Sequence, residues 1–228
     1  MIEALLLELE GVMVETRVAR LDAVARALAD DGIVFPRELL ADDVLGMAPA
    51  DAIARAASAA QAAFDPTGID LAAMRAERYF AERIGKGVTL RAGIRELLDA
   101  AYGRTRLAIV SRARRSTVEY VLGLSGASHV FSAIVCADDV LEQKPAGDGY
   151  ERALQRLHSR RPLARERALA LEDSRAGIRA AHAAGIRCLA VGDLPADHAM
   201  EADGMLPDLR GAGADALDEI ERCAFKTA

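Results

Sequence analysis

Short apolar runs bounded by turn residues recur along the chain and predict buried strands. They cover residues 4–9, 107–110, 133–135, 168–171 and 188–191. None of them alternates polar with apolar residues as a half-exposed strand does, so we expect strands that are buried on both faces.

Segments with a helical period of apolar residues separate the later runs. They cover residues 116–124, 149–157 and 175–184. Strands that alternate with helices in this way indicate a parallel sheet with helices on both sides. The predicted fold class is therefore α/β, with a Rossmann-like parallel core.

The stretch between the first two runs contains no candidate strand. Its pattern predicts amphipathic helices over residues 17–31, 37–45, 50–63 and 71–84. An insert of this size is too long for a simple crossover, so we expect a helical domain over residues 15–86 and a core formed by 1–14 and 87–228. Gly85 and Gly87 are either a hinge between the two or an ordinary loop.

Composition narrows the classes of function. The 228 residues include 52% hydrophobic ones, enough for a sizeable core, and 29 basic residues against 35 acidic ones give a net charge of -6. This balance argues against a nucleic-acid or membrane partner. The arginine-rich stretch 152–167 is either a basic patch or a solvated helix and loop, and such charge runs favour the second interpretation.

The cysteines and the first residues of the chain indicate the cellular compartment. The three cysteines are isolated and the four histidines form no zinc-binding pattern. The first residues lack the basic region of a signal peptide, and no apolar run is long enough to span a bilayer. These features predict a cytoplasmic protein with reduced thiols, and they leave open whether it is a monomer or a dimer.

Chemically active side chains follow several of the predicted strands. In an open parallel sheet the ligand binds beyond the carboxyl ends of the strands, where these residues gather. They are Glu8 and Glu10, Ser111 and Arg112, Lys144, and Glu172 with Asp173. Facing carboxylates need a cation, and oxygen ligands suit Mg²⁺. The lysine and the serine hydroxyl suit a phosphoryl group.

The order of these residues resembles the haloacid dehalogenase superfamily, in the branch of phosphoglycolate phosphatase and β-phosphoglucomutase that has a helical cap. The strongest likeness lies in residues 171–185, which match the acidic motif of the family and the helix after it. Residues 109–111 resemble the hydroxyl motif and residues 144–150 the lysine motif.

The resemblance implies a role for each residue. Glu8 would attack phosphorus, and Glu10 would protonate the leaving group and then activate water. Glu8, Glu10 and Asp173 would hold Mg²⁺, with Glu172 in support. The phosphoryl group of a small phosphorylated metabolite would be held by Ser111, Arg112 and Lys144.

The chain departs from the family pattern at the nucleophile. Glutamate stands at positions 8 and 10, where the family has aspartate, and Arg112 stands where it usually has asparagine. The extra methylene moves a carboxylate by about 1 Å, a displacement that can cost on the order of a hundredfold in rate.

Two functions follow from this pattern. One is a Mg²⁺-dependent phosphatase that is weakened at Glu8 and Glu10. The other is a non-catalytic relative that binds a cation or a phospholigand in a regulatory or partner-binding role. Dehalogenase chemistry is a weaker third reading, because it also requires an aspartate nucleophile.

Overall fold

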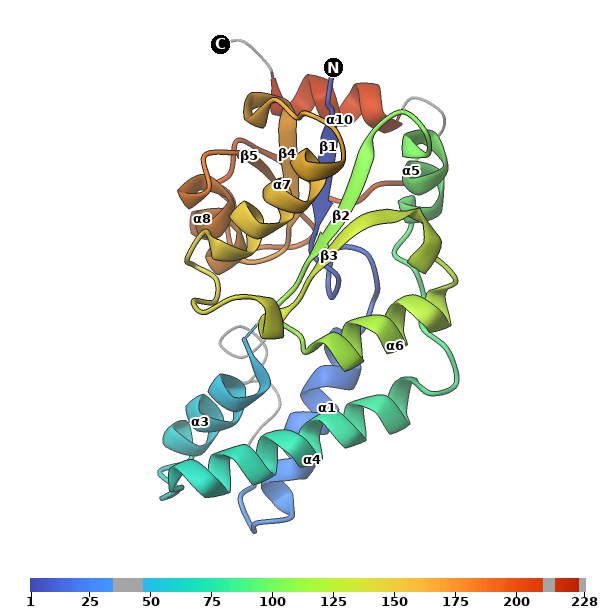
Figure 1. The fold of residues 1–228 in the computed structure, drawn as a ribbon. Helices are drawn as coiled ribbons and strands as arrows, with labels where there is room; N and C mark the ends of the chain where they lie inside the picture. Colours follow the sequence, from blue (N-terminus) through green and yellow to red (C-terminus); the bar gives the residue numbers. More distant parts are fainter. Residues whose placement is uncertain (35–46, 211–215, 226–228) are drawn as a thin grey trace. The chain divides into compact units, whose positions relative to one another are not determined.

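The computed structural model describes residues 1–34, 47–210 and 216–225 (Figure 1). The chain divides into two compact units. The first combines Met1–Glu15 with Thr89–Ala228, and the second is Thr16–Val88.

A six-stranded sheet forms the centre of the first unit. Its strand order is β3-β2-β1-β4-β5-β6, and every neighbouring pair is parallel. The strands are β1 (Ala4–Leu7), β2 (Arg106–Val110), β3 (Phe131–Val135), β4 (Ala168–Glu172), β5 (Arg187–Val191) and β6 (Gly204–Leu206). The predicted α/β class with a parallel Rossmann-like sheet is confirmed.

The helices of this unit lie between its strands along the chain, except the last, which follows β6. They are α5 (Ile94–Ala101), α6 (Arg115–Ser125), α7 (Asp148–Arg160), α8 (Arg175–Ala183), α9 (Ala196–Ala199) and α10 (Ala216–Ala224). The α7 and α8 helices pack together over one face of the sheet (Figure 1). The core on that face contains Leu6 of β1, Tyr150 and Leu157 of α7, and Ile178 of α8.

Both faces of the central strand are buried. Leu5 and Leu7 alternate with Leu6 along β1 and are as fully buried as it is. Since successive side chains of a strand point to opposite faces, the sheet is covered on both sides. This explains why the strands read as continuous apolar runs.

The second unit is helical in its described residues, 16–34 and 47–88. It consists of α1 (Arg17–Ala29), α3 (Pro49–Ala59) and α4 (Pro66–Ile84), which pack against one another. Their small apolar faces meet around Leu28, Ile53 and Phe80. No helix in the described part of the whole chain is both long and apolar enough to cross a membrane.

The structure differs from the sequence prediction in several elements. The first strand ends at Leu7 rather than at residue 9, because the chain turns there and both Met13 N and Val14 N donate to Leu9 O at 3.0 Å. The short edge strand β6 and the helices α5, α9 and α10 were not predicted. The helix predicted over residues 37–45 lies outside the described residues.

Candidate active site

Glu8 follows the last residue of β1 and is nearly buried. Its backbone N–H still pairs with Leu171 O at 3.1 Å, which fixes the start of the turn beside β4. Its Oε1 accepts a hydrogen bond from Leu9 N at 2.7 Å, and its Oε2 lies 2.6 Å from Lys144 Nζ. Both carboxylate oxygens therefore have a donor.

Lys144 lies in the loop after β3 and is buried, with 7% of its surface exposed. Its Nζ donates to Glu8, to Val110 O at 2.8 Å and to Glu172 Oε1 at 2.5 Å. These three acceptors come from the carboxyl ends of β1, β2 and β4. One ammonium group is therefore hydrogen-bonded to the ends of three parallel strands.

Glu172 is the last residue of β4 and has no exposed surface. Its Oε1 also accepts a hydrogen bond from Tyr150 Oη at 2.6 Å, and its Oε2 lies 3.4 Å from Ser174 Oγ. A side chain at Gly177 would overlap this carboxylate, so the glycine leaves the space that Glu172 occupies.

Burial and charge set the protonation of this cluster. Burial raises the pKa of Glu172, and the nearby Glu8 carboxylate acts in the same direction. Burial alone would lower the pKa of Lys144, but the Glu172 and Glu8 carboxylates outweigh it and raise that pKa. The lysine therefore stays charged between the two acids.

Asp173 lies next to the turn that follows β1. A Cβ at position 11 would overlap its carboxylate, so only glycine allows this close approach. Gly11 also has a φ of +87°, which favours glycine. Asp173 and the segment after Glu8 are thereby brought side by side.

The end of β2 supplies Ser111 and Arg112. Ser111 is buried; its N–H pairs with Val135 O at 3.0 Å, and its Oγ accepts from Ala113 N at 3.3 Å. The buried Nε of Arg112 has no hydrogen-bond partner among the described residues. Because Lys144 binds the carbonyl of Val110, the preceding residue, these side chains belong to the same edge of the sheet.

The candidate residues differ in how closely the structure gathers them. Direct side-chain bonds join Glu8, Lys144 and Glu172, and Asp173 lies against Gly11. Glu10 is half-buried in the turn after β1. Sequence reasoning gave Tyr150 no role. Its position on the buried face of α7, six residues after Lys144, is the signal that would have drawn attention to it.

The proposed magnesium ligands are Glu8, Glu10 and Asp173, whose oxygens have the chemistry that Mg²⁺ prefers. In the described residues, however, no three acidic, histidine or cysteine side chains stand together as a metal-binding group. Lys144 binds one oxygen of Glu8 and the Leu9 N–H binds the other, and each of these oxygens keeps a lone pair that could bind an ion.

The chain is similar to known proteins over most of its length. A family model described as haloacid dehalogenase-like hydrolase matches residues 5–191. The protein CbbY of Cereibacter sphaeroides is 32% identical over 196 residues, covering 83% of this chain and 84% of CbbY.

Two solved structures of CbbY from Rhodobacter sphaeroides share this fold. One, in complex with phosphate, has a TM-score of 0.82 at 30% identity and covers 96% of this chain and 100% of its own. The other is a mutant in complex with xylulose-(1,5)bisphosphate, with a TM-score of 0.77 at 30% identity, covering 93% of this chain and 97% of its own. The family match, which spans most of the sequence, shows that this chain belongs to the haloacid dehalogenase-like hydrolases.

Proposed function

We propose that this protein is a phosphatase of a small phosphorylated metabolite, slowed at its first chemical step. The observation that carries the proposal is the position of Lys144, whose ammonium lies between Glu8 and Glu172 at the carboxyl edge of the sheet. A buried cation beside a strand-end carboxylate is suited to a phosphoryl group that must meet a nucleophile.

The reaction would proceed in two displacements. A carboxylate oxygen of Glu8 bonds to phosphorus while the bond from phosphorus to the leaving oxygen breaks, and Glu10 gives that oxygen a proton. Glu10 then takes a proton from water, which attacks the phosphorus of the glutamyl phosphate. This releases inorganic phosphate and restores Glu8. Ser111 and Lys144 would hold the phosphoryl oxygens.

The slow step is the attack by Glu8. Each of its carboxylate oxygens already accepts from a donor, Leu9 N or Lys144, which stabilises the carboxylate before attack and makes it a weaker nucleophile. The longer side chain also places its oxygens about 1 Å from where an aspartate would hold them, which can cost on the order of a hundredfold in rate.

Magnesium belongs to this proposal as a cofactor. Glu8, Glu10 and Asp173 would hold it, with Glu172 in support, and when bound it would neutralise phosphoryl charge. The ammonium of Lys144 beside Glu8 repels a second cation, so we expect weak affinity for the ion. The helical unit is proposed as the cap that selects the substrate, and a sugar phosphate is the class we favour because a CbbY structure holds xylulose-(1,5)bisphosphate.

A non-catalytic role is the second candidate. It is favoured by one observation, that both carboxylate oxygens of Glu8 already accept a donor. Such a protein would bind a phosphorylated ligand at Lys144 and Ser111 without cleaving it.

A turnover assay separates the two. The native chain is incubated with Mg²⁺ and an aryl phosphate, glycolate phosphate or a pentose bisphosphate, and phosphate release is followed. We expect slow release that Asp173→Ala abolishes and Asp99→Asn, an exposed acid on α5, leaves unchanged. Saturable binding of a sugar phosphate without any release would support the non-catalytic candidate.

A further inference from the structure

A hollow lies at the edge of the sheet opposite the candidate active site, where β1, β2 and β3 begin. Its volume is about 670 Å³, and its lining includes Glu3, Arg106 and Phe131, at or next to the first residues of those strands. Parallel strands all start at one edge, so this hollow is remote from the strand ends that carry Glu8 and Glu172.

The hollow is strongly basic. Its charged lining residues are Glu3, Arg104, Arg106, Arg160, Arg161 and Arg167, and His129 lines it as well. Five guanidinium groups thus face one carboxylate, in a chain whose net charge is -6. Such a local excess of positive charge attracts anions.

Only part of this charge is neutralised inside the protein. Glu3 pairs with Arg106 at 3.3 Å and with Arg167 at 3.0 Å. In the described ranges, Arg104, Arg160 and Arg161 are exposed and have no acidic partner. Three guanidinium groups therefore remain available around the hollow.

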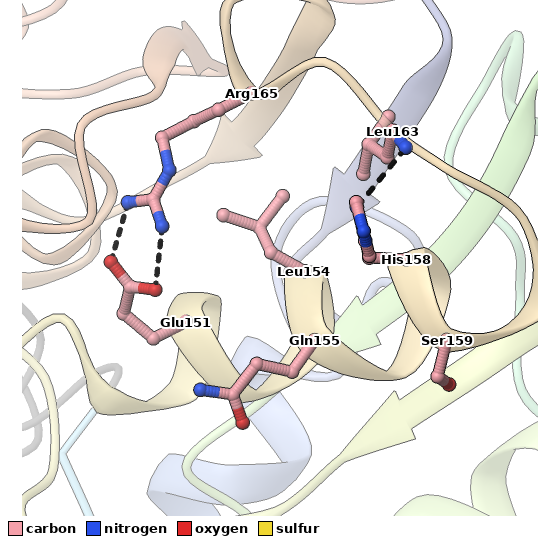
Figure 2. A pocket seen from close by; sticks show the side chains of 7 residues that line it. All are labelled: Glu151, Leu154, Gln155, His158, Ser159, Leu163 and Arg165. Atoms are coloured by element: carbon pink, nitrogen blue, oxygen red, sulfur yellow. Dashed lines mark hydrogen bonds and ion pairs between the residues drawn. The ribbon is translucent and has the colours of Figure 1, made fainter.

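A smaller hollow on α7 provides a contrast (Figure 2). Its arginine, Arg165, is paired with Glu151 through two bonds of 2.5 and 2.8 Å. Figure 2 shows the two side chains facing each other, with Leu154 between them and His158. The charge there is already satisfied, unlike that of the three arginines of the basic hollow.

Backbone contacts hold the basic hollow in place. Arg106 donates to Glu3 O at 3.4 Å and to Arg161 O at 2.6 Å, which connects the start of the sheet to the loop after α7. Tyr102 also lines the hollow and is 67% exposed, so that its ring offers an aromatic surface beside the arginines.

We propose that this hollow binds a small anion with two or more phosphate groups, at a site separate from the candidate active site. Arginine suits phosphate because its planar guanidinium donates two parallel hydrogen bonds. A compact ligand is favoured over nucleic acid or a membrane surface, because the negative charge of the remaining chain repels an extended polyanion.

Calorimetric titration with sodium tripolyphosphate, without Mg²⁺ and at low salt, tests the proposal. The native chain should bind it saturably. Arg104→Ala/Arg161→Ala should weaken binding about tenfold or more, whereas Arg95→Ala/Arg152→Ala, an equal loss of exposed charge outside the hollow, should change it little. The proposal would be overturned if the two double variants lost affinity equally, if Arg104→Ala/Arg161→Ala kept the native affinity, or if the native chain showed no saturable binding.

Titration with ATP identifies the kind of anion. ATP that binds more tightly than tripolyphosphate, with the difference removed by Tyr102→Ala, would identify a nucleotide that stacks on the tyrosine ring. Equal binding of the two would identify the phosphate chain alone as the recognised group. Either result supports the proposed site when the Arg104→Ala/Arg161→Ala variant loses the binding.

Discussion

The ammonium of Lys144 lies 2.5 Å from a carboxylate oxygen of Glu172, a residue with no exposed surface. The same ammonium lies 2.6 Å from Glu8. Removing one partner from a buried ionic cluster leaves the other charges without compensation. The resulting loss in the free energy of unfolding exceeds the net stabilisation that the intact cluster provides.

Lys144→Met should therefore destabilise the protein strongly, by about 3–5 kcal/mol in the free energy of unfolding. Urea titration measures this change. The double variant Lys144→Met/Glu172→Gln removes one of the two stranded charges and should recover part of the loss. A single variant as stable as the native chain would show that the ion pair does not hold the strand ends together.

The close approach of Asp173 to Gly11 gives a second prediction. Gly11→Ala places a methyl group on the Asp173 carboxylate and adds the strain of a positive φ. The matched control is Gly126→Ala, since Gly126 has a φ of +71° with nothing within 4 Å of its Cβ position. The Gly11 variant should lose about 1–3 kcal/mol more than the control, as overpacking does. Equal losses in urea titration would mean that Asp173 moves aside freely.

The strands and the polar residues that follow them could be predicted from the sequence because they depend on local pattern, although the end of β1 was placed two residues too late. Buried strands read as apolar runs, and each is followed by its polar residues, as Glu172 and Asp173 follow β4. The edge strand β6 could not be found in this way, because it has three residues and begins with glycine.

Contacts between distant segments could not be predicted from the sequence. The bond from Tyr150 to Glu172 and the approach of Asp173 to Gly11 depend on the packing of α7 and of the turn after β1. The family resemblance indicated which residues share the sheet edge. It did not indicate that both oxygens of Glu8 accept hydrogen bonds from the protein.

Alkaline pH should destabilise the fold. Burial raises the pKa of the Cys136 thiol from 9.0 to about 12, and burial also raises the pKa of Cys188 and of Tyr150. Each group ionises more easily in the unfolded chain, so its contribution is complete below its ordinary pKa and is lost as the pH rises toward its folded value. Above pH 9 for the two cysteines and above pH 10 for Tyr150, each group lowers the free energy of unfolding by up to about 1.4 kcal/mol per pH unit, and for Cys136 this loss continues to about pH 12.

Urea titrations across this pH range measure the slope. Cys136→Ala should flatten it, whereas Cys223→Ala, at a half-buried cysteine, serves as the control. A slope that is the same in the Cys136 variant and in the native chain would contradict this account.

The most direct test of the central claim, that Glu8 and Glu10 limit an otherwise complete phosphatase site, is the ratio of two kcat/KM values. The Glu8→Asp/Glu10→Asp variant is compared with the native chain on a pentose bisphosphate with Mg²⁺. The single variant Glu10→Asp is measured as well, and the further gain of the double variant over it is the part of the effect that is due to Glu8. The account predicts a gain of about a hundredfold in the double variant, most of it absent from Glu10→Asp. A folded double variant that is no faster than the native chain would contradict it.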